Sequence, residues 1–280
     1  MSKKWNMIVD IERCNNCRGC FLAVKDEHTG NDFPGYAAEQ PAMGANWLEI
    51  ERKERGAYPI VDAHFMPTMC NHCDDAPCLK AGGGAVKKRS DGIVIIDPVK
   101  AKGRKDIVEA CPYGSITWNE ELELPQAWIF DAHLLDAGWN QTRCEQQCPT
   151  DVFKSVKVED NEMQRIAQEE GLEVLNPELG TKPRVYYKNM HLFTQCFVGG
   201  TVVETADGFE ECAEGAEVVL KKDGNEMGKA ITDTFGEFKF DKLEPNSGAY
   251  QLEISGSGGA ASATVEVAED SIYAGVIALS

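Results

Sequence analysis

Apolar and polar positions alternate in four short runs along the last third of the chain. The apolar members of these runs are Ala216, Val218 and Leu220; Phe238 and Phe240; Tyr250, Leu252 and Ile254; and Val265 and Val267. A period of two puts one face of a strand on a core and leaves the other face in water. Turn-forming residues separate the runs, at Asp223-Gly224, Phe235-Gly236, 245–248 and 256–259. The pattern predicts antiparallel strands arranged as a small β-sandwich or barrel.

The first two thirds of the chain show little periodicity, and Gly and Pro are spread through them. One helix is predicted over residues 161–170, because Met163, Ile166 and Ala167 share a helical face and Gly171 provides a stop. A second, short helix is predicted over residues 106–110. A region with so few regular elements needs another source of cohesion, and bound metal clusters would supply it.

The chain has 280 residues, which corresponds to about two domains. Residues 201–280 carry 16 acidic and 5 basic side chains and no arginine, whereas the earlier residues are closer to neutral. The pair Gly199-Gly200 stands at this change of composition. We therefore predict a first domain over residues 1–198 and a β-sandwich domain over residues 199–280.

The formal net charge of −18 argues against nucleic acid as a partner, because phosphates are bound by basic surfaces. No apolar run approaches the roughly 18 residues that span a bilayer. The first residues also lack the apolar stretch and the cleavage site of a secretory signal. We expect a cytoplasmic protein with neither a nucleic-acid nor a membrane partner.

Eleven cysteines are the most unusual feature of the composition. In a reducing compartment they favour metal binding or catalysis over disulfides. Eight of them form two triads and two Cys-Pro singles: Cys14, Cys17 and Cys20 (C-x2-C-x2-C); Cys70, Cys73 and Cys78 (C-x2-C-x4-C); and Cys111 and Cys148. A [4Fe-4S] cluster takes four thiolates, commonly three from one loop and one from a distant Cys-Pro. The eight residues therefore make two complete ligand sets.

Structural zinc is the alternative for the two triads, with His72 of the CNHC stretch as a further ligand. Zinc sites usually consist of two spaced pairs, whereas this chain has triads and isolated Cys-Pro partners. We therefore expect iron–sulfur clusters, and a packing role for His72. The run Gly82-Gly83-Gly84 lacks the GK[ST] ending of a phosphate-binding loop, so we expect a turn there.

Four stretches resemble the cysteine motifs of a known family: VDIERCNNCRGC, PTMCNHCDDAPCLKAGGGAV, GIVIIDPVKAKGRKDIVEACPYGSI and the stretch ending CEQQCPT. The family is that of the iron–sulfur (β) subunits of dimethyl sulfoxide reductase-type molybdopterin enzymes, and the resemblance covers residues 1 to about 198. It implies an α+β chain whose first domain is ferredoxin-like, of the tandem bacterial-ferredoxin type. TDTFGEFKFDKL and AYQLEI resemble the transthyretin-like or Cna-B-type sandwich modules appended to many enzymes.

The full family pattern has four motifs of four cysteines, and this chain departs from it. The positions without cysteine are Val24 in the first motif; Gly82 in the second; Ala101, Arg104 and Ile107 in the third; and Ile129 and Ala132 in the fourth. Valine, isoleucine and alanine are residues that fill a vacated cavity. We expect Arg104 to point to solvent or to pair with an acidic residue.

In the family, each cluster takes three ligands from one motif and one from its paired motif. The resemblance thus implies one cluster on Cys14, Cys17, Cys20 and Cys148, and a second on Cys70, Cys73, Cys78 and Cys111. The third-motif cluster has no thiolate left, and the fourth-motif cluster has only Cys144, with Asp131 and His133 nearby as unusual ligands in the alternative. We expect two [4Fe-4S] clusters, and free, buried thiols at Cys144, Cys196 and Cys212.

Within the family, the sandwich domain and the KPRVYYKN segment resemble the small subunits of transhydroxylases acting on polyhydroxylated benzenes. The resemblance implies a heterodimer in which a large catalytic subunit carries molybdenum and molybdopterin guanine dinucleotide, so we expect no catalytic residue in this chain. The fourth-motif cluster lies between the two retained ones in the family, and its loss suits a hydroxyl transfer without net oxidation. The alternatives are an electron-transfer subunit of an aromatic hydroxylase or catechol dehydroxylase, and a free-standing ferredoxin-type carrier.

Overall fold

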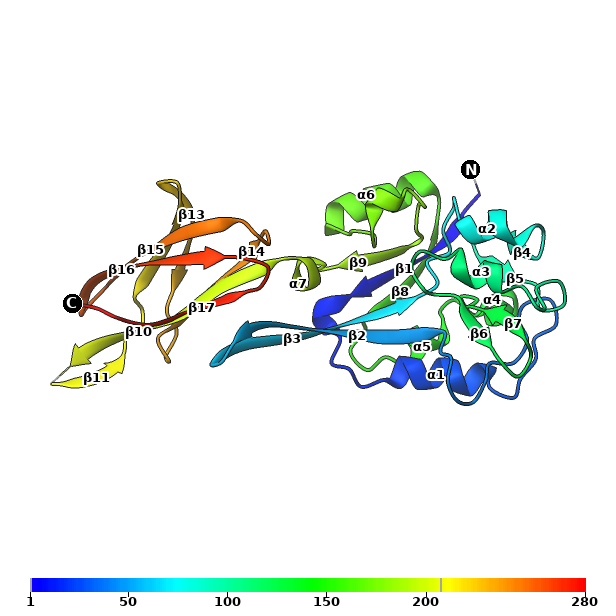
Figure 1. Ribbon diagram of the computed structural model, residues 1–280, viewed down its shortest axis with the longest axis horizontal. Coiled ribbons are helices and arrows are strands. Elements are labelled where there is room, and N and C mark those ends of the chain that lie inside the picture. Colours follow the sequence, from blue (N-terminus) through cyan, green and yellow to red (C-terminus); the bar gives the residue numbers. More distant parts are fainter. Residues whose placement is uncertain (1, 207) are drawn as a thin grey trace. The chain divides into compact units, whose positions relative to one another are not determined.

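The computed structural model describes residues 2–206 and 208–280 and divides them into two compact units (Figure 1). The first unit comprises the residues up to Arg52 together with Phe65–Met190, and the second comprises Lys53–His64 and His191–Ser280. Gly199 and Gly200 lie inside strand β10 (Cys196–Ala206). The boundary between the two compact units therefore differs from the boundary between the predicted domains, 1–198 and 199–280. Those domains stay a prediction.

A three-stranded sheet forms the centre of the first unit. Strand β1 (Lys4–Asp10) lies between β8 (Phe153–Val158), which is antiparallel to it, and β9 (Val185–Lys188), which is parallel. Five consecutive residues of β1 are buried, so both of its faces are covered. A strand buried on both faces shows no alternation of apolar and polar residues, which is why the sequence did not reveal this sheet.

Short helices and hairpins surround the sheet. The helices are η1 (Ile11–Arg13), α1 (Gly19–His28), α2 (Pro77–Gly82), α3 (Lys105–Glu109), α4 (Ala132–Asp136), α5 (Arg143–Gln147), α6 (Asp160–Glu170) and η2 (Pro177–Leu179), and the hairpins are β4 (Val86–Lys88) with β5 (Val94–Ile96) and β6 (Thr117–Asn119) with β7 (Leu124–Gln126). Both predicted helices are confirmed, as α6 and α3. Helix α6 ends at Gly171, whose φ of 62° is a left-handed conformation that favours glycine.

The second unit contains two four-stranded sheets. One joins β11 (Phe209–Cys212), β10 and β14 (Glu237–Leu243), with β17 (Ile272–Ala278) also paired to β10; the other has the order β13 (Asn225–Ile231), β12 (Glu217–Lys222), β15 (Gly248–Gly256) and β16 (Gly259–Val267). Helix α7 (His191–Thr194) precedes β10. All ten apolar residues of the predicted runs are buried in one core shared by the two sheets, which is the arrangement of a β-sandwich. Strand β17 is parallel to β10, a departure from the expected antiparallel pairing.

Glycines in β10 have a packing role. A Cβ atom on Gly200 would lie 2.7 Å from Cζ of Phe238, and one on Gly199 would lie 3.2 Å from Cδ1 of Ile60. The two glycines therefore allow side chains of the second unit to approach the strand closely, at the position where the change of composition suggested a domain boundary.

A hairpin of β2 (Leu48–Ala57) and β3 (Ile60–Met69) places Arg55 in the second unit. Arg55 is 3% exposed, and its guanidinium donates to both carboxylate oxygens of Asp241, at 2.9 and 3.0 Å, and to Asp62 at 2.9 Å. It also donates to the carbonyl of Gln195. Burial acts to raise the pKa of Asp241, but the hydrogen bonds and charge of Arg55 hold it at about 2.

Replacing Arg55 with Met should destabilise the second unit by about 2–4 kcal/mol at neutral pH, because the carboxylate of Asp241 would remain half-buried without its bidentate partner. Since the folded pKa of Asp241 is depressed, its contribution is present above the unfolded value near 3.8 and is lost as the pH falls toward 2. The difference between wild type and R55M in urea unfolding should therefore shrink below pH 4. Lys53→Met, at an exposed side chain 4.0 Å from Asp270, is the control and should cost less than about 1 kcal/mol. Equal stability of R55M and wild type would contradict the stabilising role of the Arg55–Asp241 pair.

Candidate metal centres

Four cysteines of the first unit converge where η1, α1 and α5 meet. Cys14 follows η1, Cys20 lies in the first turn of α1, and Cys148 follows α5. The thiols of Cys14, Cys148 and Cys17 all lie close enough to Cys20 to raise its pKa electrostatically. The structure thus brings together the four residues of the first predicted set.

The loop between Cys14 and Cys20 has an unusual backbone. Asn16 and Arg18 adopt left-handed conformations with φ of 58° and 60°, and the amide of Cys17 donates to the side chain of Asn15 at 3.3 Å. Left-handed residues without glycine are uncommon and persist where surrounding interactions hold them. Asn16 and Arg18 stand between the cysteines, so these left-handed residues curl the loop that carries three thiols at intervals of three positions.

The second set is assembled from β3, α2 and α3. Cys70 directly follows β3, Cys78 lies in α2, and Cys111 follows α3. Cys111, Cys78 and Cys73 each act electrostatically to raise the pKa of Cys70. These four thiols therefore also share one neighbourhood, which is the neighbourhood predicted for them.

Burial is the main cause of the raised thiol pKa values at both centres. It raises the pKa of Cys20 to about 12 and that of Cys78 to about 11, with neighbouring thiols adding to the shift. Four thiolates grouped in a partly buried site repel one another unless a cationic centre lies among them, and a thiol that coordinates a metal is deprotonated. All eleven cysteines, each within the described residues, are free. Each set of four thiols thus has the donor chemistry that a [4Fe-4S] cluster requires.

Among residues 2–206 and 208–280, no three His, Cys, Asp or Glu side chains are grouped as ligands of a single metal ion. A cubane presents four separate iron corners, so its ligand sulfurs stand farther apart than those around one ion.

The vacated third-motif positions are filled by packing. Ala101 and Ile107 are fully buried in the cluster of apolar residues that includes Cys73 and Cys78, and a Cβ atom on Gly82 would lie 2.5 Å from a methyl group of Val86. Gly82 ends α2, and Gly83 follows in a left-handed conformation, so the helix stops where a turn was expected.

Arg104 has the acidic partner that was expected for it. Its guanidinium pairs with Asp106 at 2.6 Å and donates to the carbonyl of Ala81 at 2.7 Å. The side chain thereby supplies donors to the carboxyl end of α2, where backbone carbonyls lack helical partners. Arg104 therefore links α2 to α3 through hydrogen bonds, at a position where the family pattern has a cysteine.

The surroundings of Cys144 are also densely filled. Cys144 and Ala132 are 0% exposed, Val24 is 1% exposed and Ile129 is 3% exposed. Burial raises the pKa of Cys144 far above its usual value, and the charge of Asp131 and the neighbouring Cys20 add to this. The thiol lies 3.1 Å from the hydroxyl of Thr142.

Asp131 is engaged by three donors, all from residues that the sequence did not single out as its partners. One carboxylate oxygen lies 3.3 Å from Nε2 of His28 and 3.3 Å from Nε1 of Trp128, and the other accepts the amide of Arg143 at 2.7 Å. Because a carboxylate only accepts, Nε2 of His28 carries the proton in this pair. Asp131, His28 and Trp128 are all 0% exposed. The contact with His28 joins segments 103 residues apart, so it has no local sequence signal.

His133 was the other residue considered as an unusual cluster ligand, and it also has an acidic partner. Its Nε2 lies 2.9 Å from a carboxylate oxygen of Glu27. His72 is buried beside Trp128 and Phe130, and accepts the amide of Val94 on Nδ1 at 3.1 Å. Burial lowers the pKa of His72 to about 3, so the ring is neutral.

Two of the three remaining cysteines are buried as expected, and one is not. Cys144 and Cys196 are 0% and 4% exposed, whereas Cys212 is exposed on β11. The expectation for Cys212 was wrong because β11 has no residue with a buried side chain.

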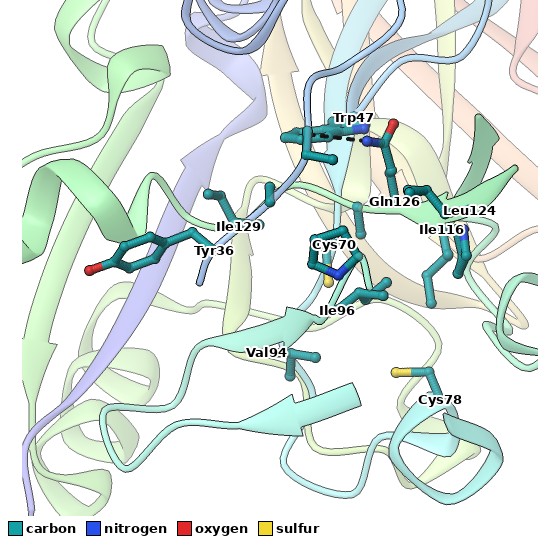
Figure 2. Close-up of a pocket in the computed structure, with 15 residues that line it drawn as sticks. Tyr36, Trp47, Cys70, Cys78, Val94, Ile96, Ile116, Leu124, Gln126 and Ile129 are labelled. Atoms are coloured by element: carbon teal, nitrogen blue, oxygen red, sulfur yellow. Dashed lines mark hydrogen bonds between the residues drawn. The ribbon is translucent and has the colours of Figure 1, made fainter. Parts of the chain in front are cut away.

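A small cavity of ≈ 20 Å³ adjoins the second set (Figure 2). Cys70 and Cys78 lie on its wall together with apolar side chains, among them Val94 and Ile96, and Ile129 lies on the same wall. An apolar lining of this kind keeps water from the ligand sulfurs and lowers the local dielectric.

Comparison with known proteins finds iron–sulfur relatives of this chain. Residues 61–158 match the model of a 4Fe-4S dicluster domain. The chain is 45% identical to the pyrogallol hydroxytransferase small subunit of Pelobacter acidigallici, over 99% of this chain and 100% of that protein. It is 28% identical to the iron–sulfur subunit ArrB of arsenate respiratory reductase from Shewanella sp., over 65% of this chain and 94% of that protein. It is 33% identical to the β subunit of dimethylsulfide dehydrogenase from Rhodovulum sulfidophilum, over 53% of this chain and 46% of that protein.

Among solved structures, 5-hydroxyisourate hydrolase from Klebsiella pneumoniae is 18% identical, covers 30% of this chain and 84% of its own, and has a TM-score of 0.25. That likeness is too distant to carry an argument. Among the described residues, no helix has the length and apolar character needed to cross a membrane. The whole-chain identity to a small subunit and the dicluster domain decide the family: this chain belongs to the iron–sulfur subunits of the dimethyl sulfoxide reductase family of molybdopterin enzymes, as a relative of the pyrogallol hydroxytransferase small subunit.

Proposed function

We propose that this chain is the iron–sulfur subunit of a heterodimeric molybdopterin enzyme that acts on polyhydroxylated benzenes, as a pyrogallol–phloroglucinol transhydroxylase does. The observation that carries the proposal is the 45% identity over 99% of the chain, because an alignment of that extent includes the sandwich unit as well as the cysteine motifs. The matches to ArrB and to dimethylsulfide dehydrogenase cover 65% and 53% of the chain.

Two ligand sets hold [4Fe-4S] clusters in this proposal. Cys14, Cys17, Cys20 and Cys148 bind one, and Cys70, Cys73, Cys78 and Cys111 bind the other. When bound, such clusters accept and release single electrons at potentials set by charge, hydrogen bonds and exposure. The protein residues position the sulfurs, exclude water and hold the surrounding charges.

The space around Cys144 holds no third cluster in this proposal. Its support is the packing of Val24, Trp128, Asp131 and Cys144, each at most 1% exposed. The oxygens of Asp131 are already used by three N–H donors, so the carboxylate has little capacity left for iron. A chain without this intermediate cluster is poorly suited to rapid electron transfer over its length, and suits a reaction that moves hydroxyl groups without net oxidation.

Catalysis takes place in the partner. The large subunit supplies molybdenum and molybdopterin guanine dinucleotide, and this chain supplies no catalytic residue. The first unit has a ferredoxin-like fold of the tandem type in this proposal, and the second is a transthyretin-like or Cna-B-type module that extends the subunit.

The iron content tests the ligand sets. The purified wild-type protein should contain about eight iron atoms per chain, since two cubanes hold four each. Cys148→Ser should lower the content to about four, because it removes one thiolate of the first set. Cys144→Ser is the matched control, a buried cysteine near the same set, and should leave about eight. A wild-type content near twelve, or a loss of iron in C144S, would disprove the two-cluster arrangement.

Stability tests the role of Asp131. Asp131→Ala leaves three buried N–H donors without an acceptor and should destabilise the protein by about 3 kcal/mol. Asp131→Asn keeps one acceptor and should fall between the alanine variant and wild type, as measured by thermal unfolding. Asp26→Ala, at a side chain 80% exposed, should change stability by less than about 0.5 kcal/mol. All three should keep the wild-type iron content. Loss of about four iron atoms in D131A would instead identify Asp131 as a cluster ligand.

The activity of the native complex tests the function. The chain should co-purify one-to-one with a large molybdenum-containing subunit, and the complex should exchange hydroxyl groups between trihydroxybenzenes without an external electron acceptor. Turnover that requires an added acceptor or donor would indicate a hydroxylase or dehydroxylase instead. A chain that purifies alone, without molybdenum, would indicate a free-standing carrier.

A further inference from the structure

Lys88 lies against the loop that carries Cys73. Its ammonium donates to the backbone carbonyls of His72 at 2.6 Å and Cys73 at 2.9 Å, and to the carboxylate of Asp74 at 2.7 Å. Three acceptors use all three donors of an ammonium group, so the geometry is that of a charged lysine. The side chain is 20% exposed, which leaves this charge only partly screened by water.

The surrounding ion pairs leave an excess of positive charge. Arg184, 4% exposed at its side chain, pairs with Asp74 and, at 2.9 Å, with Asp160. Lys4 pairs with Asp160 at 2.8 Å and lies 3.6 Å from Asp74. Three cations thus share two carboxylates, and the cation nearest to the cysteine loop is Lys88.

A hydroxyl group lies on the other side of Cys73. Thr181 is 5% exposed, and its hydrogen bond to the sulfur of Cys73 acts to lower the pKa of that thiol, against the larger effect of burial. The Thr181 hydroxyl lies 2.6 Å from the hydroxyl of Tyr113, two residues after Cys111. Hydrogen bonds to ligand sulfur and nearby positive charge act in the same direction, because both stabilise added negative charge.

From this arrangement we infer that Lys88 is a positioning residue that raises the reduction potential of the cluster held by Cys70, Cys73, Cys78 and Cys111. The inference rests on the proposed function, since it requires a cluster at that set. One-electron reduction adds one negative charge to the cluster, and a fixed cation held against the loop of Cys73 favours the reduced form. Asp74 has the opposite effect, because its carboxylate offsets part of the same positive charge.

Redox titration of the full-length protein in its native complex tests the inference. The sample is reduced stepwise with dithionite, and the signals of the two reduced clusters are followed by electron paramagnetic resonance. Lys88→Gln removes the charge and keeps an N–H donor for the carbonyls, and should lower the reduction equilibrium constant of one cluster at least tenfold, which is about 59 mV for one electron. Asp74→Asn should move the same cluster in the opposite direction. Lys88→Arg should restore the potential to within about threefold in the equilibrium constant.

The neighbouring Lys87 provides a matched control, because it lies on the same strand with an exposed side chain. Lys87→Gln should leave both potentials unchanged. An unchanged potential in K88Q, or a shift of the other cluster, would overturn the inference. If K88Q loses iron, the reduction potential of the same cluster in D74N decides. A higher potential in D74N than in wild type supports the inference, and an unchanged potential overturns it. A wild-type protein without two reducible clusters would be a failure of the proposed function itself, and is recognised before any variant is compared.

Discussion

The first unit is organised by the need to keep eight thiols in two groups, and three of these thiols, at Cys20, Cys73 and Cys78, are buried. Burial raises the pKa values of Cys20 and Cys78, and neighbouring thiols raise them further. A cationic centre makes such a grouping favourable, so binding of an iron core and folding of the loops are coupled. Cys20 and Cys78 lie in α1 and α2, whereas Cys111 and Cys148 follow α3 and α5.

The two vacated motifs have been filled in different ways. At the third motif, small and aliphatic side chains pack against the second cysteine set, and Arg104 ties α2 to α3 through carbonyls and Asp106. At the fourth motif, a buried carboxylate is held by His28, Trp128 and a backbone amide. A buried charge is costly unless it is hydrogen-bonded, and Asp131 lies within hydrogen-bond distance of three donors. In the proposed two-cluster arrangement, both solutions replace the cohesion that a cluster would give with contacts made by the chain itself.

Local patterns in the sequence predicted what depends on local physics. Alternation at Ala216, Val218 and Leu220 predicted a strand with one buried face, and the resemblance to the cysteine motifs of the family predicted which thiols share a neighbourhood. The sheet around β1 was not predictable, because a strand covered on both faces has no alternation. Gly199 and Gly200 suggested a domain boundary, whereas Gly200 accommodates the ring of Phe238 inside a strand. Asp241 and His28, which are partners of Arg55 and Asp131, come from distant segments, so only the folded structure brings these pairs together.

Charge is distributed unevenly along the chain, and the local charge near a site can differ in sign from the net charge of −18. Residues 201–280 account for most of the net negative charge of the chain. The loop of Cys73, in contrast, is bordered by three cations that share two carboxylates. An overall acidic chain can therefore still present a positive local environment to a buried site, because distant surface charges are screened by salt and water while half-buried ones are not. In the proposed arrangement, the potential of the second centre therefore depends on the few charged residues around Cys73.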